Sequence, residues 1–138
     1  MKTLVVFYSF TGHTKAIATK KARKLGADLL EIRELKKRSR PGAYLFGSLA
    51  ARKRREVALD AFPTDWSSYD RILIAVPVWW GYPAPAFNTL VKCLPKGKEV
   101  EVDMVSASGE TTPSAAGTKQ LIADLGCHLI RYLDVKAG

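Results

Sequence analysis

The N-terminal segment joins a buried strand, a hydroxyl-rich turn and the start of a helix. Residues 4–8, Leu-Val-Val-Phe-Tyr, form an apolar run typical of a strand buried on both faces. Residues 9–14 then read Ser-Phe-Thr-Gly-His-Thr, and apolar residues recur at helical spacing from Thr14 to Leu25. This junction predicts hydroxyls and unpaired backbone N–H groups at the positive end of a helix dipole, which favours a phosphate. The same residues also suit a capped strand–helix turn without a ligand.

The size and composition of the chain indicate one domain over residues 1–138 with a core of its own. Its 47% hydrophobic and 25% charged residues are ordinary for a globular protein. No apolar stretch approaches the roughly 20 residues of a membrane span, and Met1-Lys2-Thr3 leads into the first strand without a signal-peptide cleavage site. Cys93 and Cys127 match no metal or redox spacing. We therefore expect a cytoplasmic protein with free thiols and no metal site.

Strand-like and helix-like segments alternate along the rest of the chain. Apolar runs predict further strands at residues 29–32, 71–76, 100–105 and 128–135, and Pro77 is expected to end the third strand. Helical patterns occupy residues 14–25, 86–94 and 112–125, and the stretch between Arg33 and Asp70 is expected to hold one helix and a long loop. Such alternation implies parallel strands joined by crossovers. The predicted fold is a single doubly wound α/β domain with a five-stranded parallel sheet.

Ligands of such sheets bind at the carboxyl ends of the strands, where the strand order reverses. This rule brings three loops together: Ser9–Thr14, Pro77–Pro83 and Ser106–Thr112. The second loop holds Trp79 and Trp80, whose flat faces suit stacking on a planar ligand, although one could pack in the core while the other covers it. The third loop is small and polar. A phosphate turn without Gly-x-Gly-x-x-Gly, an aromatic platform and a polar loop together favour a mononucleotide with a flat ring.

These residues resemble the flavodoxin-like family of FMN-binding proteins. Its N-terminal signature holds from Val5 to Ala18, and Lys21 departs from it because the family carries an aliphatic residue there. The resemblance implies FMN held without a covalent bond, and no side chain is expected to act as a catalytic acid or base. The expected contacts are Ser9, Phe10, Thr11, Gly12, His13 and Thr14 around the phosphate, and Pro77, Val78, Trp79, Trp80, Gly81, Ser106, Ser108 and Gly109 around the ring.

Two features depart from that family. Familiar flavodoxins are acidic, whereas this chain has a net charge of +9, concentrated in residues 15–55 with clusters at 20–24, 36–40 and 52–55. In addition, nothing resembling the family's fifth helix follows the last predicted strand, and that helix would lie on the same sheet face as the first. We expect the apolar face left without it to be covered by a second subunit, giving a homodimer, or by residues 33–65.

Three functions remain open at this stage. The leading one is an FMN electron carrier with an acidic redox partner protein, in which nearby positive charge raises the flavin potential. The second is an FMN-dependent oxidoreductase that passes hydride from NAD(P)H to quinones or similar acceptors, although the sequence shows no nicotinamide motif. The third is a binding module that uses the basic patch to hold an acidic protein or nucleic acid. Nucleic acid is the least favoured partner because no known nucleic-acid module is visible.

Overall fold

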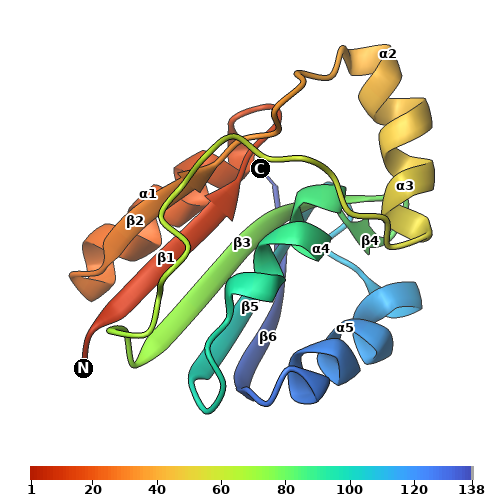
Figure 1. The fold of residues 1–138 in the computed structure, drawn as a ribbon. Helices are drawn as coiled ribbons and strands as arrows, with labels where there is room; N and C mark the ends of the chain where they lie inside the picture. The colour runs from red at the N-terminus through yellow and green to blue at the C-terminus, as the bar shows by residue number, and fades with distance from the viewer. Residues whose placement is uncertain (138) are drawn as a thin grey trace.

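A parallel sheet of five long strands forms the centre of the molecule (Figure 1). The computed structural model describes residues 1–137, and of Ala43 and Tyr44 it describes the backbone alone. The strands lie side by side in the order β2-β1-β3-β5-β6, and every neighbouring pair is parallel. The order therefore reverses between β1 and β3. Their bounds are β1 Thr3–Tyr8, β2 Asp28–Ile32, β3 Arg71–Trp79, β5 Glu99–Ser106 and β6 His128–Lys136.

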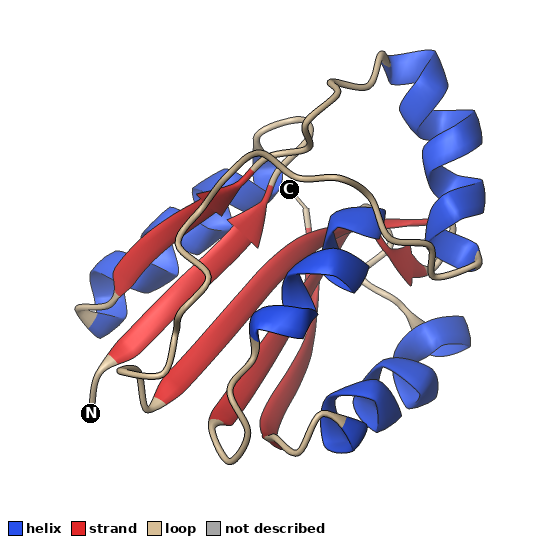
Figure 2. Cartoon of the chain, in the orientation of Figure 1, coloured by secondary structure: helices blue, strands red, loops and turns tan. Residues whose placement is uncertain are grey.

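Helices cover both faces of this sheet, and Figure 2 shows α1 on one side with α4 and α5 on the other. The alternation of side chains along β1 explains the two layers. Val5 and Phe7 pack in a small core beneath α1, whereas Val6 joins a larger core with Phe87 of α4 and Ile122 of α5. The predicted doubly wound α/β fold is confirmed. The helices are α1 His13–Leu25, α4 Pro85–Leu90 continued by a 3₁₀ turn over Val91–Cys93, and α5 Thr112–Asp124.

The stretch between β2 and β3 consists of one helical run and one long strap, as predicted. The run comprises α2 (Arg40–Gly42), a π turn η1 (Ala43–Gly47) and α3 (Ser48–Arg52), and it stands at the carboxyl edge of the sheet (Figure 1). The strap, residues 53–70, then crosses the face that α4 and α5 also cover. Its apolar side chains pack against the larger core there: Val57, Leu59, Phe62, Trp66 and Tyr69.

The prediction that Pro77 ends the third strand is wrong. β3 continues to Trp79, and β4 (Tyr82–Pro83) folds back to pair with it in antiparallel register. β1 pairs with β3 only as far as Ala75, so no strand on that side requires the N–H that proline lacks. The carbonyl of Pro77 instead accepts the backbone N–H of Ala84 at 2.9 Å. A short hairpin thus extends β3 beyond the edge of its neighbour.

The α1-facing side of β5 carries a charged cluster where an apolar surface was expected. Glu101 and Asp103 point to this face and are almost fully buried. Lys21 of α1 forms ion pairs with both carboxylates, which gives the unusual lysine of the first helix a structural role. The strap packs on the opposite face, so the expectation that residues 33–65 cover this side is wrong. Cover by a second subunit stays a prediction.

Candidate functional site

The turn between β1 and α1 presents backbone N–H groups at a helix N-terminus. Gly12 caps α1 with φ of 104°, a left-handed conformation that side chains disfavour. Ser9 Oγ accepts the backbone N–H groups of Gly12 at 3.1 Å and Lys15 at 3.2 Å, which fixes the shape of the turn. Within residues 1–137, the N–H groups of His13 and Thr14 have no hydrogen-bond acceptor. These donors and the positive end of the helix dipole make the turn suitable for an anion.

The hairpin of β3 and β4 holds an aromatic residue in a strained turn. Its two-residue tip is Trp80-Gly81, with φ values of 53° and 80°, as in a type I′ turn. Glycine accepts such a conformation readily, whereas a bulky residue there is rare. From behind the tip, Ser114 Oγ of α5 donates a hydrogen bond to the Gly81 carbonyl. Strained backbone of this kind clusters at functional sites, so Trp80 is a candidate for a functional residue.

The two neighbouring tryptophans lie in different environments. Trp79 meets the rings of Tyr8 and Phe10 edge-on, with centroids 6.2 Å and 5.8 Å away, and the Arg38 guanidinium lies 5.8 Å from its centroid. Trp80 is 48% exposed at the tip of the hairpin. Trp79 therefore serves as a wall of the site, and Trp80 is the more exposed of the two side chains.

Hydroxyl groups in the loop after β5 hold its own backbone in shape. Ser106 Oγ accepts the N–H of Gly109 at 2.8 Å, and Ser108 Oγ accepts that of Glu110 at 3.3 Å. Gly109 has φ of 75°, and a Cβ there would contact Lys136 at 3.4 Å. The loop is thus a rigid turn packed against the end of β6.

The three loops border one cleft where the strand order reverses. It consists of two adjoining cavities of about 550 and 270 Å³ that share Thr11, His13, Val78 and Trp79. The larger cavity extends to Phe10, Trp80, Arg40 and Ser48, and the smaller to Thr14, Pro77, Val105, Ser106, Ala107 and Ala137. Cofactor sites usually measure roughly 300–1,000 Å³, so the cleft is large enough for a nucleotide.

The expected site residues divide into two groups in the structure. One group lines the cleft: Phe10, Thr11, His13, Thr14, Pro77, Val78, Trp79, Trp80 and Ser106. The other shapes the loops without lining it: Ser9, Gly12, Gly81, Ser108 and Gly109. Arg40 and Ser48 were missed because no motif marks the helical run as part of a site. Ala107 was missed because its small side chain carries no chemical signal.

Comparisons with known proteins agree with this architecture. No family model and no curated protein matches the chain. Among solved structures, a flavoprotein in complex with FMN from Lactobacillus acidophilus NCFM is 28% identical with a TM-score of 0.76, and the alignment covers 99% of this chain and 93% of that one. The chain has a flavodoxin-like fold.

Two further structures show this flavodoxin-like fold at lower identity. A candidate flavoprotein from Bacteroides eggerthii DSM 20697 is 24% identical with a TM-score of 0.82, covering 96% of this chain and 86% of that one. A flavodoxin from Streptococcus pneumoniae TIGR4 is 14% identical with a TM-score of 0.58, covering 100% of this chain and 86% of that one.

The basic residues of this flavodoxin-like chain are spread over two separate regions. α1 runs back from the turn at Gly12, so the cluster at 20–24 begins about 10 Å along the helix from its N-terminus. The cluster at 36–40 lies beside the cleft, and Arg40 lines it. Of these two clusters, only the one at 36–40 therefore contributes a residue to the cleft.

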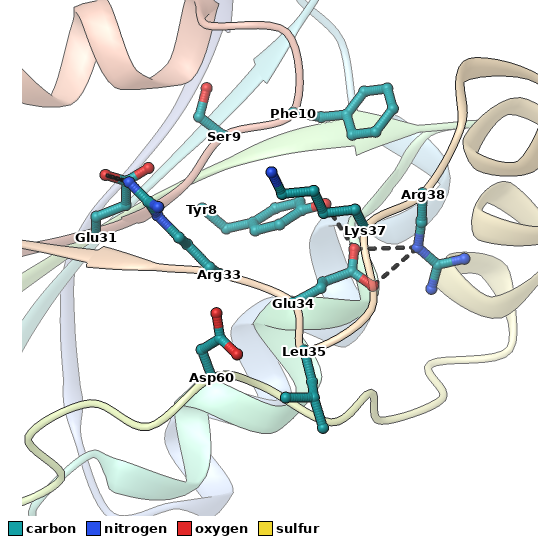
Figure 3. A pocket seen from close by; sticks show the side chains of 10 residues that line it. All are labelled: Tyr8, Ser9, Phe10, Glu31, Arg33, Glu34, Leu35, Lys37, Arg38 and Asp60. Carbon is teal, nitrogen blue, oxygen red and sulfur yellow. Dashed lines mark hydrogen bonds and ion pairs between the residues drawn. The ribbon is translucent and has the colours of Figure 1, made fainter.

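A separate cavity of about 390 Å³, which shares Phe10 with the cleft, lies between the ends of β1 and β2 and the segment that follows β2 (Figure 3). Glu34 forms its wall, accepting hydrogen bonds from the Tyr8 hydroxyl and from Arg38 Nε. Burial and this hydrogen bond raise the pKa of Tyr8 well above its usual range. Arg33 pairs with Glu31 at 3.2 Å. Both arginines of the cavity therefore have carboxylate partners already, which makes the cleft the better anion site.

Proposed function

We propose that this chain binds FMN without a covalent bond and acts in electron transfer. The observation that carries the proposal is the meeting of two features across one cleft. The unpaired N–H groups of His13 and Thr14 form one side, and the strained, exposed Trp80 forms the other. A phosphate linked to a flat ring matches both. The 28% identity to a flavoprotein in complex with FMN supports the same ligand.

The residues present fit this cofactor. A Cβ on Gly12 would meet nothing within 4 Å, so the space at the turn is open. The N–H groups of His13 and Thr14 would hold the phosphate, and Trp80 and Trp79 would border the ring. Ser106 and Ala107 line the smaller cavity, where the ring edge would lie.

FMN, when bound, supplies the redox chemistry itself. The chain contributes binding, orientation and exclusion of water, for which the rigid hairpin and the turn at Gly12 are suited. Arg40 provides positive charge beside the ring, which favours the reduced, more negative form of a flavin. A redox partner that docks near this edge would be an acidic protein, by charge complementarity.

The test begins with the absorption spectrum of the purified protein and a titration of the flavin-free protein with FMN and riboflavin. FMN is expected to bind more tightly than riboflavin, because riboflavin lacks the phosphate. Equal affinities would contradict a phosphate site at His13 and Thr14, and no binding of FMN would refute the proposal.

Variants locate the ring within the cleft. Trp80→Ala is expected to weaken FMN binding by about 3- to 10-fold, as lost aromatic stacking predicts. Phe46→Ala is the matched control, because Phe46 is 66% exposed and does not line the cleft. Turnover of NAD(P)H with a quinone, measured on the FMN-loaded protein, separates an oxidoreductase from a carrier. If the protein is an electron carrier, we expect no such turnover without a partner protein.

A further inference from the structure

The helical run Arg40–Arg52 carries three large apolar side chains that point away from the protein. Leu45, Phe46 and Leu49 are 55%, 66% and 40% exposed, and none belongs to either core. The side of the run that faces the body consists of small residues, Gly47, Ser48 and Ala51, all buried. This arrangement is the reverse of an ordinary amphipathic helix on a globular protein, whose apolar stripe faces the core.

Contacts with the body fix this orientation. A Cβ on Gly47 would come within 2.7 Å of the Trp79 ring, so only glycine allows this approach. Arg38, before the run, bonds to Glu34, and Arg54, after it, donates to the Ser114 carbonyl at 3.1 Å and to Thr118 Oγ1 at 3.0 Å. The run is therefore held at both ends. Rotation that buried Leu45 and Phe46 would break these contacts.

The same segment is strongly basic. Residues 35–55 contain eight Lys and Arg and no Asp or Glu. Arg38 and Arg54 are committed to the contacts above, whereas the other six are exposed: Lys36, Lys37, Arg40, Arg52, Lys53 and Arg55. Exposed Leu and Phe flanked by Lys and Arg are typical of helices that lie in the interface of anionic membranes.

We infer that the outward face of Arg40–Arg52 docks on an anionic lipid surface. No helix among the described residues is long and apolar enough to cross a membrane. A second copy of the chain is disfavoured because it would oppose two basic faces. A stable protein interface needs about 800 Å² per partner and a surface of matching shape, whereas a lipid surface needs no shaped counterpart.

Docking would leave the cleft usable, because Arg40 and Ser48 line the cleft while Leu45, Phe46 and Leu49 do not. The inference does not depend on the proposed function. Vesicle binding can be measured whether or not flavin is bound, and FMN affinity can be measured without vesicles.

The experiment is sedimentation of the purified protein with vesicles of phosphatidylcholine, alone or with about one third phosphatidylglycerol. Binding is expected only to the anionic vesicles. Combined replacement Leu45→Ser, Phe46→Ser and Leu49→Ser is expected to weaken it at least tenfold, with the unfolding midpoint unchanged because these side chains are exposed. Lys36→Gln with Lys53→Gln is expected to weaken it by about 5-fold per residue. The control Lys20→Gln with Lys24→Gln removes equal charge from α1 and is expected to have much less effect.

Failure of the unaltered protein to bind anionic vesicles overturns the inference. Equal losses in the Lys36/Lys53 and Lys20/Lys24 variants would mean attraction to net charge rather than docking by this face. Light scattering provides a further check. A dimer that the three serine replacements abolish would assign the face to a second copy and also overturn the inference.

Discussion

The charged cluster beneath α1 is expected to make the free energy of unfolding depend on pH. Glu101 and Asp103 share the amine of Lys21, which lies 2.6 Å from Asp103. Burial and the neighbouring Glu101 raise the pKa of Asp103 to about 7, from a usual value of 3.8. Although burial opposes it, hydrogen bonds with Asp103 and Lys21 lower the pKa of Glu101. Near pH 6 the folded protein therefore holds a proton on Asp103 that the unfolded chain releases.

The sign follows from this difference in bound protons. A carboxyl whose pKa is raised by folding destabilises the protein progressively as the pH rises from the unfolded pKa to the folded one. Each pKa unit is worth about 1.4 kcal/mol, so a shift of about three units limits the effect to about 4 kcal/mol. From about pH 5 to about pH 8 the expected loss is about 2–3 kcal/mol. Glu101 and Lys21 contribute little here, because the lowered pKa of Glu101 and the raised pKa of Lys21 lie outside this range.

Asp103→Asn is expected to remove most of this loss and to make the variant more stable than the unaltered protein at about pH 8. The assay is urea unfolding followed by tryptophan fluorescence at several pH values. Asp124→Asn is the control, because the Asp124 side chain is exposed and, among the described residues, bonded only to Gln120. The free energy of unfolding of this variant is expected to depend on pH as that of the unaltered protein does. The reasoning is refuted if Asp103→Asn keeps the full pH dependence, or if the unaltered protein gains stability toward pH 8.

Three further substitutions test other parts of the structure. Gly12→Ala places a side chain at φ of 104° and is expected to cost about 1–2 kcal/mol in urea unfolding and to weaken FMN binding; unchanged values would contradict the strained turn. Tyr8→Phe removes the donor to Glu34 and is expected to cost about 1 kcal/mol, with FMN affinity unchanged as its control. Arg40→Gln is expected to lower the potential of bound FMN by tens of millivolts, measured by spectroelectrochemistry; a rise would refute the role of its charge.

The parts of the fold that sequence reasoning predicted are those governed by local patterns. The apolar runs of β1 and β3 and the glycine after Leu25 act on their immediate neighbours, so periodicity and capping were enough. The loops at the carboxyl edge of the sheet were also predicted, because local patterns mark where each strand ends. Which hydroxyls point to a ligand could not be predicted, because this depends on hydrogen bonds within each loop. The hydroxyls of Ser9 and Ser108 accept backbone N–H groups of their own loops.

The features that were missed depend on contacts between distant segments. The alternation Val-Glu-Val-Asp in β5 is typical of a strand with one face in water, yet Lys21 covers both carboxylates from α1. β4 requires a turn whose first residue is left-handed, and Trp80 is a poor choice for it by local preference. The placement of Arg40 in the cleft follows from how the whole helical run packs on Trp79.

The left-handed Trp80 combines backbone strain with a place in the lining of the cleft. Glycine, asparagine and aspartate are the residues that type I′ turns prefer. Replacing the tryptophan with glycine would therefore relieve the backbone strain and stabilise the hairpin. A selection for thermal stability alone would therefore favour losing the aromatic face that the cleft presents. Stabilising substitutions in this scaffold should therefore be sought at other positions, because the strained residue 80 also lines the cleft.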